Sequence, residues 1–372
     1  MSKLDNHSKR GLGIFFIALL VAAILVTIQA GRKSNLPTAK ELLTTVSMPQ
    51  VPKTVTQDTV KNFLSDELSV SVIGDIDIHY VEKKNQSTID MGYSLPFTGT
   101  LDIYTMEDGR NLISVGGVMD YGLSGPYIDD INSHYEKSYF VIVNDDLASA
   151  DIFMRELSPD TVSDNSAGNW QFVNDRELDL AAVIDQYNKD HAADYTDSAS
   201  MNKAVEGLKD MIARSAKVTE GKYRGTDCYV LTNKFDFKDK KTLARAQEFF
   251  ASLQSFDSTF HHLNLSQFLE YYGEFTVINM QMYFSKNDDP RLLACRFDLS
   301  ELRFAEYLSK MLGKDIKEIR DTVSFDVNSM YCDIVFLPAV PDSIKQTMED
   351  LVDYSDKRIL DMQTVSSNNA AE

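Results

Sequence analysis

Two short motifs in the chain contain the residue types of serine-based acyl transfer. Ser200 to Lys203 has the S-x-x-K spacing, and Ser163 to Asn165 reads S-D-N. Penicillin-recognising enzymes combine both motifs with K-T-G. In this chain S-D-N precedes S-x-x-K, the reverse of their order, and Lys241-Thr242 is followed by Leu243 instead of glycine. Ser200 also suits the N-cap of the helix predicted after it, so we expect no acyl-enzyme serine.

Metal and phosphate chemistry have no supporting spacing in the sequence. The chain has six histidines but no H-E-x-x-H or C-x-x-C motif, no glycine-rich phosphate loop and no G-x-S-x-G turn. Paired aspartates occur at Asp129-Asp130, Asp145-Asp146 and Asp288-Asp289, two of the pairs in predicted turns, where aspartate hydrogen-bonds the backbone. We expect no metal and no cofactor. A two-carboxylate hydrolase stays open as an alternative among 56 acidic residues.

Three cysteines, Cys228, Cys295 and Cys332, are too few for a disulfide-rich scaffold. Cys295 and Cys332 lie on the apolar side of predicted strands, which favours inert core residues over nucleophiles. A Cys295–Cys332 disulfide requires that the two strands are neighbours, and it remains a candidate.

The apolar sides of the strands in the second half carry long, flexible side chains. Two interpretations are open, an ordinary core and the lining of an apolar cavity between sheet and helices, because Met and Phe tolerate ligands of varied shape. The candidate lining residues are Ile278, Met280, Met282, Phe284, Leu293, Phe297, Met330, Ile334 and Phe336.

Alternating apolar and polar residues predict strands in the first half of the chain. Between Val70 and Tyr80, five apolar residues share one parity and four polar residues share the other, which indicates a half-buried antiparallel strand. The runs 101–106 and 111–121 flank Asp108-Gly109, the strongest short hairpin signal. A third pair of strands is expected on either side of 144–146.

Helices and further strands follow. Apolar stripes predict helices over 180–187, 200–212 and 243–253, and a fourth near 265–272. Strands are expected around 227–233, 277–285, 291–299 and 323–337, with a capping box at Asp298 and Glu301 before a helix around Leu308. The order is no regular βα alternation. It favours an α+β fold in which helices pack on one face of an antiparallel sheet.

Residues 11–30 form a continuous apolar run without a charged residue. Twenty helical residues span roughly 30 Å, the thickness of a bilayer core. We expect a single-pass transmembrane signal anchor, and a cleaved signal peptide is the alternative. Lys3, Lys9 and Arg10 precede the run and favour a cytosolic N-terminus at 1–10 and an extracytoplasmic C-terminal domain. Arg32 and Lys33 weaken that bias, so the opposite orientation stays open.

Composition predicts the remaining organisation. Residues 31–57 contain three prolines and many Ser and Thr residues, which favours a stalk with one short helix near Lys40, and 355–372 is expected to be a disordered tail. The folded domain is expected over 58–354. The chain carries a net charge of −19, so it should repel nucleic acid.

Four segments carry a resemblance to a known family. They are G-T-D-C-Y-V-L-T at 225–232, V-I-N-M-Q-M-Y-F-S-K at 277–286, L-L-A-C-R-F-D-L-S at 292–300 and V-P-D-S-I-K at 340–345. Their layout resembles Gram-positive extracytoplasmic lipoproteins with a LolA/LppX-like fold, over roughly residues 215–345 and more loosely over 66–157. The resemblance implies a curved antiparallel sheet, an open half-barrel, with helices on its concave face and a lipid-binding space. The chain lacks the lipobox cysteine, which the apolar helix would replace.

Three functional hypotheses result. The first is a membrane-tethered, non-enzymatic module that binds a lipid or another apolar ligand between sheet and helices. The second is an interaction or scaffold domain of the cell envelope with a solid core. The third is the extracellular hydrolase with an acidic site.

Overall fold

The computed structural model describes most of the chain between residues 36 and 369. The described residues are 36–46, 54–65, 67–84, 87–126, 128–143, 150–159, 169–172, 180–191, 198–256, 269 and 271–369. The predicted anchor at 11–30 and most of the helix predicted near 265–272 lie outside them. In the described part, no helix is both long enough and apolar enough to cross a membrane.

The described strands form one twelve-stranded sheet, and every described pairing in it is antiparallel. The order is β7-β6-β5-β4-β2-β1-β12-β11-β10-β9-β8, and β3 pairs with both β1 and β4. The strands are β1 (Leu68–Lys84), β2 (Ser87–Ser94), β3 (Phe97–Thr105), β4 (Asn111–Gly125), β5 (Ile128–Val143), β6 (Ala150–Leu157), β7 (Gln171–Phe172), β8 (Lys217–Tyr223), β9 (Thr226–Asp236), β10 (Val277–Ser285), β11 (Leu292–Asp298) and β12 (Val323–Leu337).

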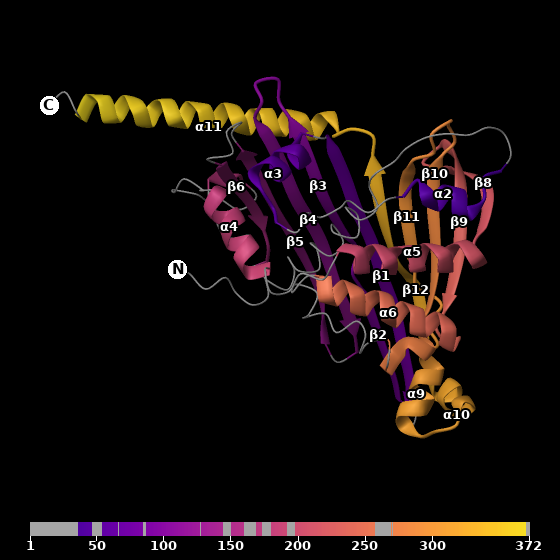
Figure 1. Ribbon diagram of the computed structural model, residues 1–372. Coiled ribbons are helices and arrows are strands. Elements are labelled where there is room, and N and C mark those ends of the chain that lie inside the picture. The colour runs from indigo at the N-terminus through magenta and orange to yellow at the C-terminus, as the bar shows by residue number, and fades with distance from the viewer. Residues whose placement is uncertain are drawn as a thin grey trace.

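The helices alternate with groups of strands. They are α2 (Ala39–Thr44), α3 (Gln57–Leu64), α4 (Leu180–His191), α5 (Ser198–Ser215), α6 (Lys240–Phe256), α9 (Phe304–Leu312), α10 (Ile316–Thr322) and α11 (Asp342–Asn369), with the 3₁₀ helix η1 (Gly273–Phe275). The predicted α+β class with a mostly antiparallel sheet is therefore confirmed (Figure 1).

Turn chemistry explains the first hairpins. β3 and β4 pair from Phe97 opposite Met119 to Thr105 opposite Asn111, and Asp108-Gly109 lies in the turn between them. Gly109 has φ +90°, a conformation that glycine adopts at no steric cost. β5 and β6 form the next pair. These strands confirm the pairs predicted from the alternation.

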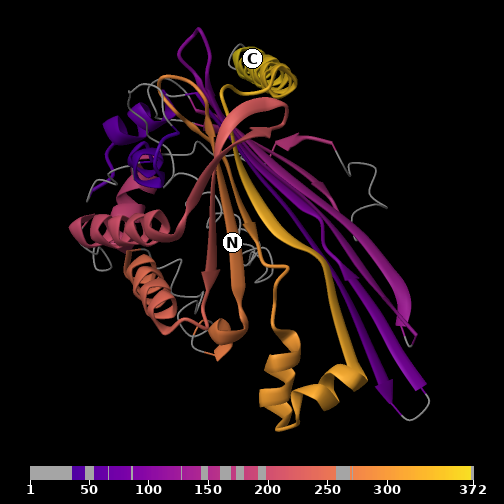
Figure 2. The same cartoon turned by 90° about the vertical axis from the view of Figure 1, so that its right-hand side faces the viewer.

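Strand β1 joins the two halves of the chain. It pairs with β12 from Ser69 opposite Leu337 to Glu82 opposite Val323, and on its other side with β3 and β2. Because cross-strand partners point to the same face, Val70, Val72 and Ile334 share one face, here called the core face. In Figure 2, β1–β5 and β8–β11 splay apart toward the bottom of the view, where α9 and α10 lie.

Most of the hydrophobic core lies on the core face. Leu42 and Leu43 of α2, Met211 of α5 and Ala246 of α6 pack there in one cluster with strands β9–β11. α3 adds a second cluster, in which Leu64 packs with Ile103, Val143 and Ala150.

Helix α11 packs on the opposite face of the sheet. Its Met348 and Val352 are each 1% exposed and contact Leu112, Phe140 and Phe153. Successive side chains of a strand point to opposite faces. Ile113 packs against the cluster under α3 on the core face, so Leu112 points to the opposite face. The expectation that helices pack on one face therefore holds for α2, α3, α5 and α6 but not for α11.

Three local predictions differ from the structure. α2 lies within the predicted stalk 31–57, yet its leucines are core residues, so this part of the stalk belongs to the folded domain. α11 runs to Asn369, through most of the range predicted to be a disordered tail, 355–372. The predicted capping box is wrong, because α9 begins at Phe304 after Arg303, and Asp298 instead accepts a hydrogen bond from the Ser300 amide.

Candidate functional site

The predicted cavity-lining residues lie mainly in a filled core. Met280, Met282, Phe284 and Ile334 are 0–4% exposed. The first three pack with α2, α5 and α6, and Ile334 packs with Val70. Ile278, Phe297 and Phe336 are partly buried against the same clusters. The core interpretation of these side chains therefore describes them better than the cavity interpretation.

Leu293 and Met330 lie outside these clusters. A register shift between Tyr283 and Phe284 places Phe284 opposite Leu292, which is the buried core residue at this point. The prediction for Leu293 is wrong because a bulge reverses the alternation. Met330 of β12 lies on the core face opposite Ile76 of β1, and it is half-buried.

The three cysteines are free. β11 and β12 are neighbours, as the candidate disulfide requires, but Cys295 lies opposite Ile334, and Cys332 lies opposite Phe297. Burial raises the pKa of Cys332 to about 11 and that of Cys295 further. Both thiols stay protonated at neutral pH, so they are core residues and not nucleophiles.

A pocket lies on the core face between α9, α10 and the start of β12. Its volume is about 410 Å³, within the roughly 300–1,000 Å³ range of small-molecule sites. Phe304, Leu308, Ile319, Arg320, Val323 and Phe325 contribute to its lining. Within the described part of the chain the exposed guanidinium of Arg320 has no ion pair, so it is available to an anionic group.

Aromatic contacts set the wall of this pocket. The rings of Phe304 and Phe325 are stacked with their centroids 3.8 Å apart. Tyr307, one turn along α9, contacts Phe304, Phe275 and Tyr272. α9 is thus attached to the sheet through side-chain stacking, although none of its residues is fully buried.

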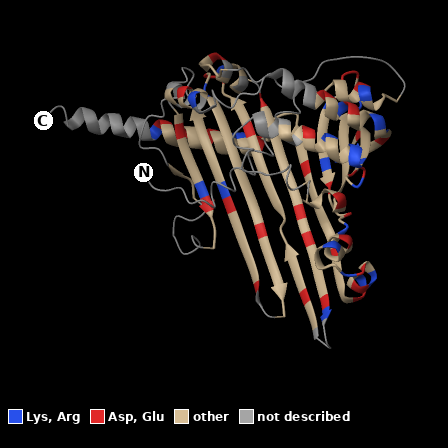
Figure 3. Cartoon of the chain, turned by 60° about the horizontal axis from the view of Figure 1, so that its bottom comes forward, with Lys and Arg blue, Asp and Glu red and all other residues tan. Residues whose placement is uncertain are grey.

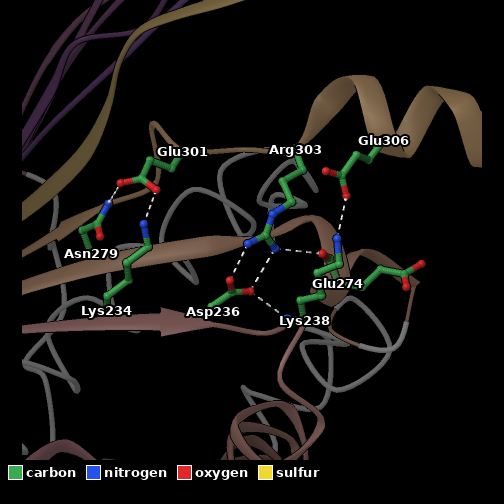
Figure 4. Close-up of polar contacts among 8 residues, drawn as sticks. All are labelled: Lys234, Asp236, Lys238, Glu274, Asn279, Glu301, Arg303 and Glu306. Carbon is green, nitrogen blue, oxygen red and sulfur yellow. Dashed lines mark hydrogen bonds and ion pairs between the residues drawn. The ribbon is translucent and has the colours of Figure 1, made fainter. Parts of the chain in front are cut away.

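A polar network holds the start of α9 against β9 and β10 (Figure 4). Arg303 binds both carboxylate oxygens of Asp236 and donates to the carbonyl of Glu274 at 3.1 Å. The guanidinium lowers the pKa of Asp236 below its ordinary value. Glu301 accepts hydrogen bonds from Lys234 and from Asn279, and these bonds lower its pKa. The network fixes the side of the pocket formed by 302–306.

Beyond the pocket the core face continues as an apolar surface whose described residues are partly or largely exposed. On β1, Tyr80 lies between Phe325 of β12 and Met91 of β2. On β4, Leu123 lies between Tyr93 of β2 and Ile131 of β5. We call the surface on β1, β2, β4 and β5 the distal apolar patch; it consists of Tyr80, Met91, Tyr93, Met119, Tyr121, Leu123, Ile131 and Tyr135.

Exposure shows that the distal apolar patch is open. Met91, Met119, Ile131 and Tyr135 are 37–43% exposed, and all four share the core face. Tyr93 and Tyr121 meet edge to face with centroids 5.6 Å apart. Burial raises the pKa of Tyr93 and Tyr80, and the Tyr80 hydroxyl also donates a hydrogen bond to the Glu82 carboxylate, which raises its pKa further.

The reverse side of the same strands is polar. His79 pairs with Asp90 at 2.5 Å, and His134 with Asp120 at 2.7 Å. Figure 3 shows acidic residues spaced along these strands. One apolar side and one acidic side make the distal part of the sheet amphipathic.

In the described part, no three His, Cys, Asp or Glu side chains come together to hold a metal ion. The sequence reasoning missed Phe304, Phe325 and the distal apolar patch. The alternation of Met119, Tyr121 and Leu123 with Asp120 was a usable signal, but the pairing that places β2 beside β4 was not visible in it.

Comparison with protein-family models, with curated proteins and with solved structures finds no match for this chain.

Proposed function

We propose that this protein is a non-enzymatic binding module that takes an amphipathic ligand into the α9–α10 pocket and along the distal apolar patch. The observation that carries the proposal is the continuity from the stacked Phe304 and Phe325 through Tyr80 to the exposed Met91. Exposed apolar surfaces of this kind mark ligand or partner sites.

The chemistry of the ligand comes from the two ends of this surface. The distal apolar patch suits a hydrocarbon tail, because its side chains are Met, Tyr, Leu and Ile. Arg320 at the pocket suits an anionic head group, which guanidinium groups bind through charge-assisted hydrogen bonds. A lipid or fatty acid combines both features.

The proposal also includes the membrane attachment and the orientation of the protein. Residues 11–30 tether the protein in a cell membrane as a single-pass helix, with 1–10 cytosolic and the domain extracytoplasmic. The sheet acts as an open half-barrel whose concave side receives the ligand, in the manner of LolA/LppX-like lipoproteins. The chain has no nucleic-acid partner, in keeping with its net charge of −19.

A binding assay with matched variants tests the uptake. The chain from residue 34 onward, purified without detergent, is expected to carry a ligand in native mass spectrometry and to bind a fluorescent fatty acid. Met91→Asn with Met119→Asn should weaken binding by roughly tenfold, because two apolar contacts of the tail are lost. Asp90→Asn with Asp120→Asn, at the adjacent positions on the reverse side, should leave binding unchanged. A consistently ligand-free protein that takes up no probe would refute the proposal.

A second function is favoured by the filled core. Met280, Met282 and Phe284 are buried in a packed cluster at the place where the cavity was predicted, which suits an interaction domain of the cell envelope. The acidic side around Asp90 and Asp120 would then contact a cationic protein. Cross-linking in whole cells should recover an envelope protein, and Asp90→Lys with Asp120→Lys should abolish its recovery; cross-links that persist in this variant exclude the acidic side as the contact.

A further inference from the structure

Two large apolar side chains project from the end of α9. Met311 is 65% exposed and Leu312 is 58% exposed, the first being the most exposed large hydrophobic residue in the described part of the chain. Gly313 then ends the helix with φ +63°, the left-handed conformation typical of a residue just beyond a helix. α10 follows after Asp315, whose side chain accepts a hydrogen bond from the Lys317 amide.

This turn lies at an extremity of the molecule. α9 and α10 form the bottom of the structure in Figures 1 and 2, and α2 lies near its top. We call residues 310–317 the α9–α10 tip. The tip adjoins the α9–α10 pocket, since Phe304 and Leu308 of the same helix line that pocket.

The charge of the tip differs in sign from that of the chain. The tip contains three lysines, Lys310, Lys314 and Lys317, and one acidic residue, Asp315. Its local net charge is therefore +2, whereas the whole chain has a net charge of −19. Lys310 pairs with Glu274 and Lys314 with Glu318, but the lysine side chains are 65% and 49% exposed, and exposed pairs exchange readily for other partners. Lys317 has no ion pair with any described residue.

Aromatic residues surround the base of the tip. Tyr272 contacts Tyr307 of α9 with ring centroids 5.5 Å apart, and Tyr271 is 62% exposed. Tyrosine is enriched where proteins meet the interface of a bilayer, and lysine extends its charged end toward head groups from an apolar stem.

We propose that the α9–α10 tip binds the surface of a lipid bilayer that contains anionic phospholipid. Met311 and Leu312 enter the boundary between head groups and acyl chains, and Lys310, Lys314 and Lys317 contact the anionic head groups. Amphipathic segments bind membranes through this combination of buried apolar area and electrostatic attraction. The inference does not rest on ligand uptake, because a tip that binds bilayers is compatible with an empty pocket.

A site-specific fluorophore tests the proposal in the full chain. An environment-sensitive probe is attached to Leu312→Cys, and in a control protein to Tyr354→Cys, which replaces a residue 57% exposed on α11. The protein is reconstituted into nanodiscs of neutral phosphatidylcholine, so that residues 11–30 are already in lipid. Vesicles of phosphatidylcholine, with or without about a third of phosphatidylglycerol, are then added.

The probe at position 312 is expected to shift to shorter wavelength and brighten roughly threefold with anionic vesicles, and about 0.5 M salt should reverse most of the change. The probe at position 354 should not respond. Lys310→Gln, Lys314→Gln and Lys317→Gln together should remove the preference for anionic vesicles. No response at position 312, or an equal response at both positions, overturns the proposal. A response only to a lipid-free envelope protein fraction overturns it in favour of a protein partner.

Discussion

Asp102 is a buried carboxylate at the centre of the sheet. It is 2% exposed, and the Ser69 hydroxyl donates a hydrogen bond to it at 2.6 Å. Burial raises its pKa above the ordinary 3.8, and the bond from Ser69 opposes the shift only in part. The folded state therefore binds this proton more tightly than the unfolded state does. Its contribution to stability is present below about pH 3.8 and is lost as the pH rises through the pKa of the folded state.

Asp102→Asn should therefore stabilise the protein at neutral pH. The amide keeps an oxygen for Ser69 and removes the buried charge, while its N–H groups bring new donors into the site and offset part of the gain. We therefore expect a gain on the order of 1 kcal/mol in the free energy of unfolding at about pH 7. The gain should narrow as the pH falls toward about 4. Urea unfolding across this range measures it. Asp326→Asn, at an exposed aspartate, is the control, and an equal gain in both variants would contradict the explanation.

Strand alternation predicted side-chain direction better than it predicted what the side chains contact. Met280 and Met282 point to the core face as expected, but only α2 and α5, which pack on them from distant parts of the chain, decide that they are core residues. Leu293 was placed wrongly because one bulge reverses the alternation. Glu301 has capping-box spacing, yet its carboxylate binds Lys234 and Asn279 on other strands.

At the scale of elements, α9 and α10 form a helical pair attached to the sheet by few contacts. The two helices stand between β11 and β12, and α9 has no fully buried residue. The attachment includes the Phe304–Phe325 stack, the network around Arg303, and Ile319 of α10, which is 2% exposed. Elements with few buried contacts open locally at low free-energy cost.

Arg303→Gln should loosen this pair without unfolding the protein. The variant removes a two-oxygen ion pair with Asp236 that is partly exposed, so we expect a loss on the order of 1 kcal/mol. Amide hydrogen exchange in α9 and α10 should then accelerate roughly fivefold, while exchange in β9 and β10 stays unchanged. Lys238→Gln, which removes the more exposed pair with Glu306, is the matched control and should have a smaller effect. Unchanged exchange in α9 after Arg303→Gln would contradict the prediction and show that the ring contacts of α9 hold the helix without this ion pair.

Sequence signals for elements succeeded where they were local. Asp108-Gly109 located the first hairpin, and apolar stripes located α4, α5 and α6 within a few residues. Helix α9 begins later than predicted, because its start is set by Arg303 reaching Asp236 and by ring packing, not by a side-chain cap. Long-range pairing such as β1 with β12 has no local signature and was not predicted.

At the scale of the whole molecule, the folded domain begins before the predicted boundary at residue 58. Thr38 and Glu41 form a capping box at the start of α2. Leu42 and Leu43 are 1% and 3% exposed and pack with Met211, Phe284 and Cys295. Proline and serine content suggested a stalk, but burial of two leucines outweighs composition, because apolar area removed from water stabilises the folded state. The span between the predicted anchor and the domain is accordingly shorter.

Leu42→Ala should destabilise the whole domain if α2 is part of it. Removing a fully buried leucine leaves a cavity, and we expect a loss of about 2–5 kcal/mol in the free energy of unfolding. Leu36→Ala, six residues earlier at a side chain 48% exposed, should change it by less than about 0.5 kcal/mol. Thermal unfolding of the two variants, followed by the same far-ultraviolet signal, compares them. Equal free energies of unfolding for the two variants would contradict the prediction, because truncating an exposed Leu42 would not destabilise the protein. Residues 31–57 would then lie outside the folded domain, as the stalk prediction has it.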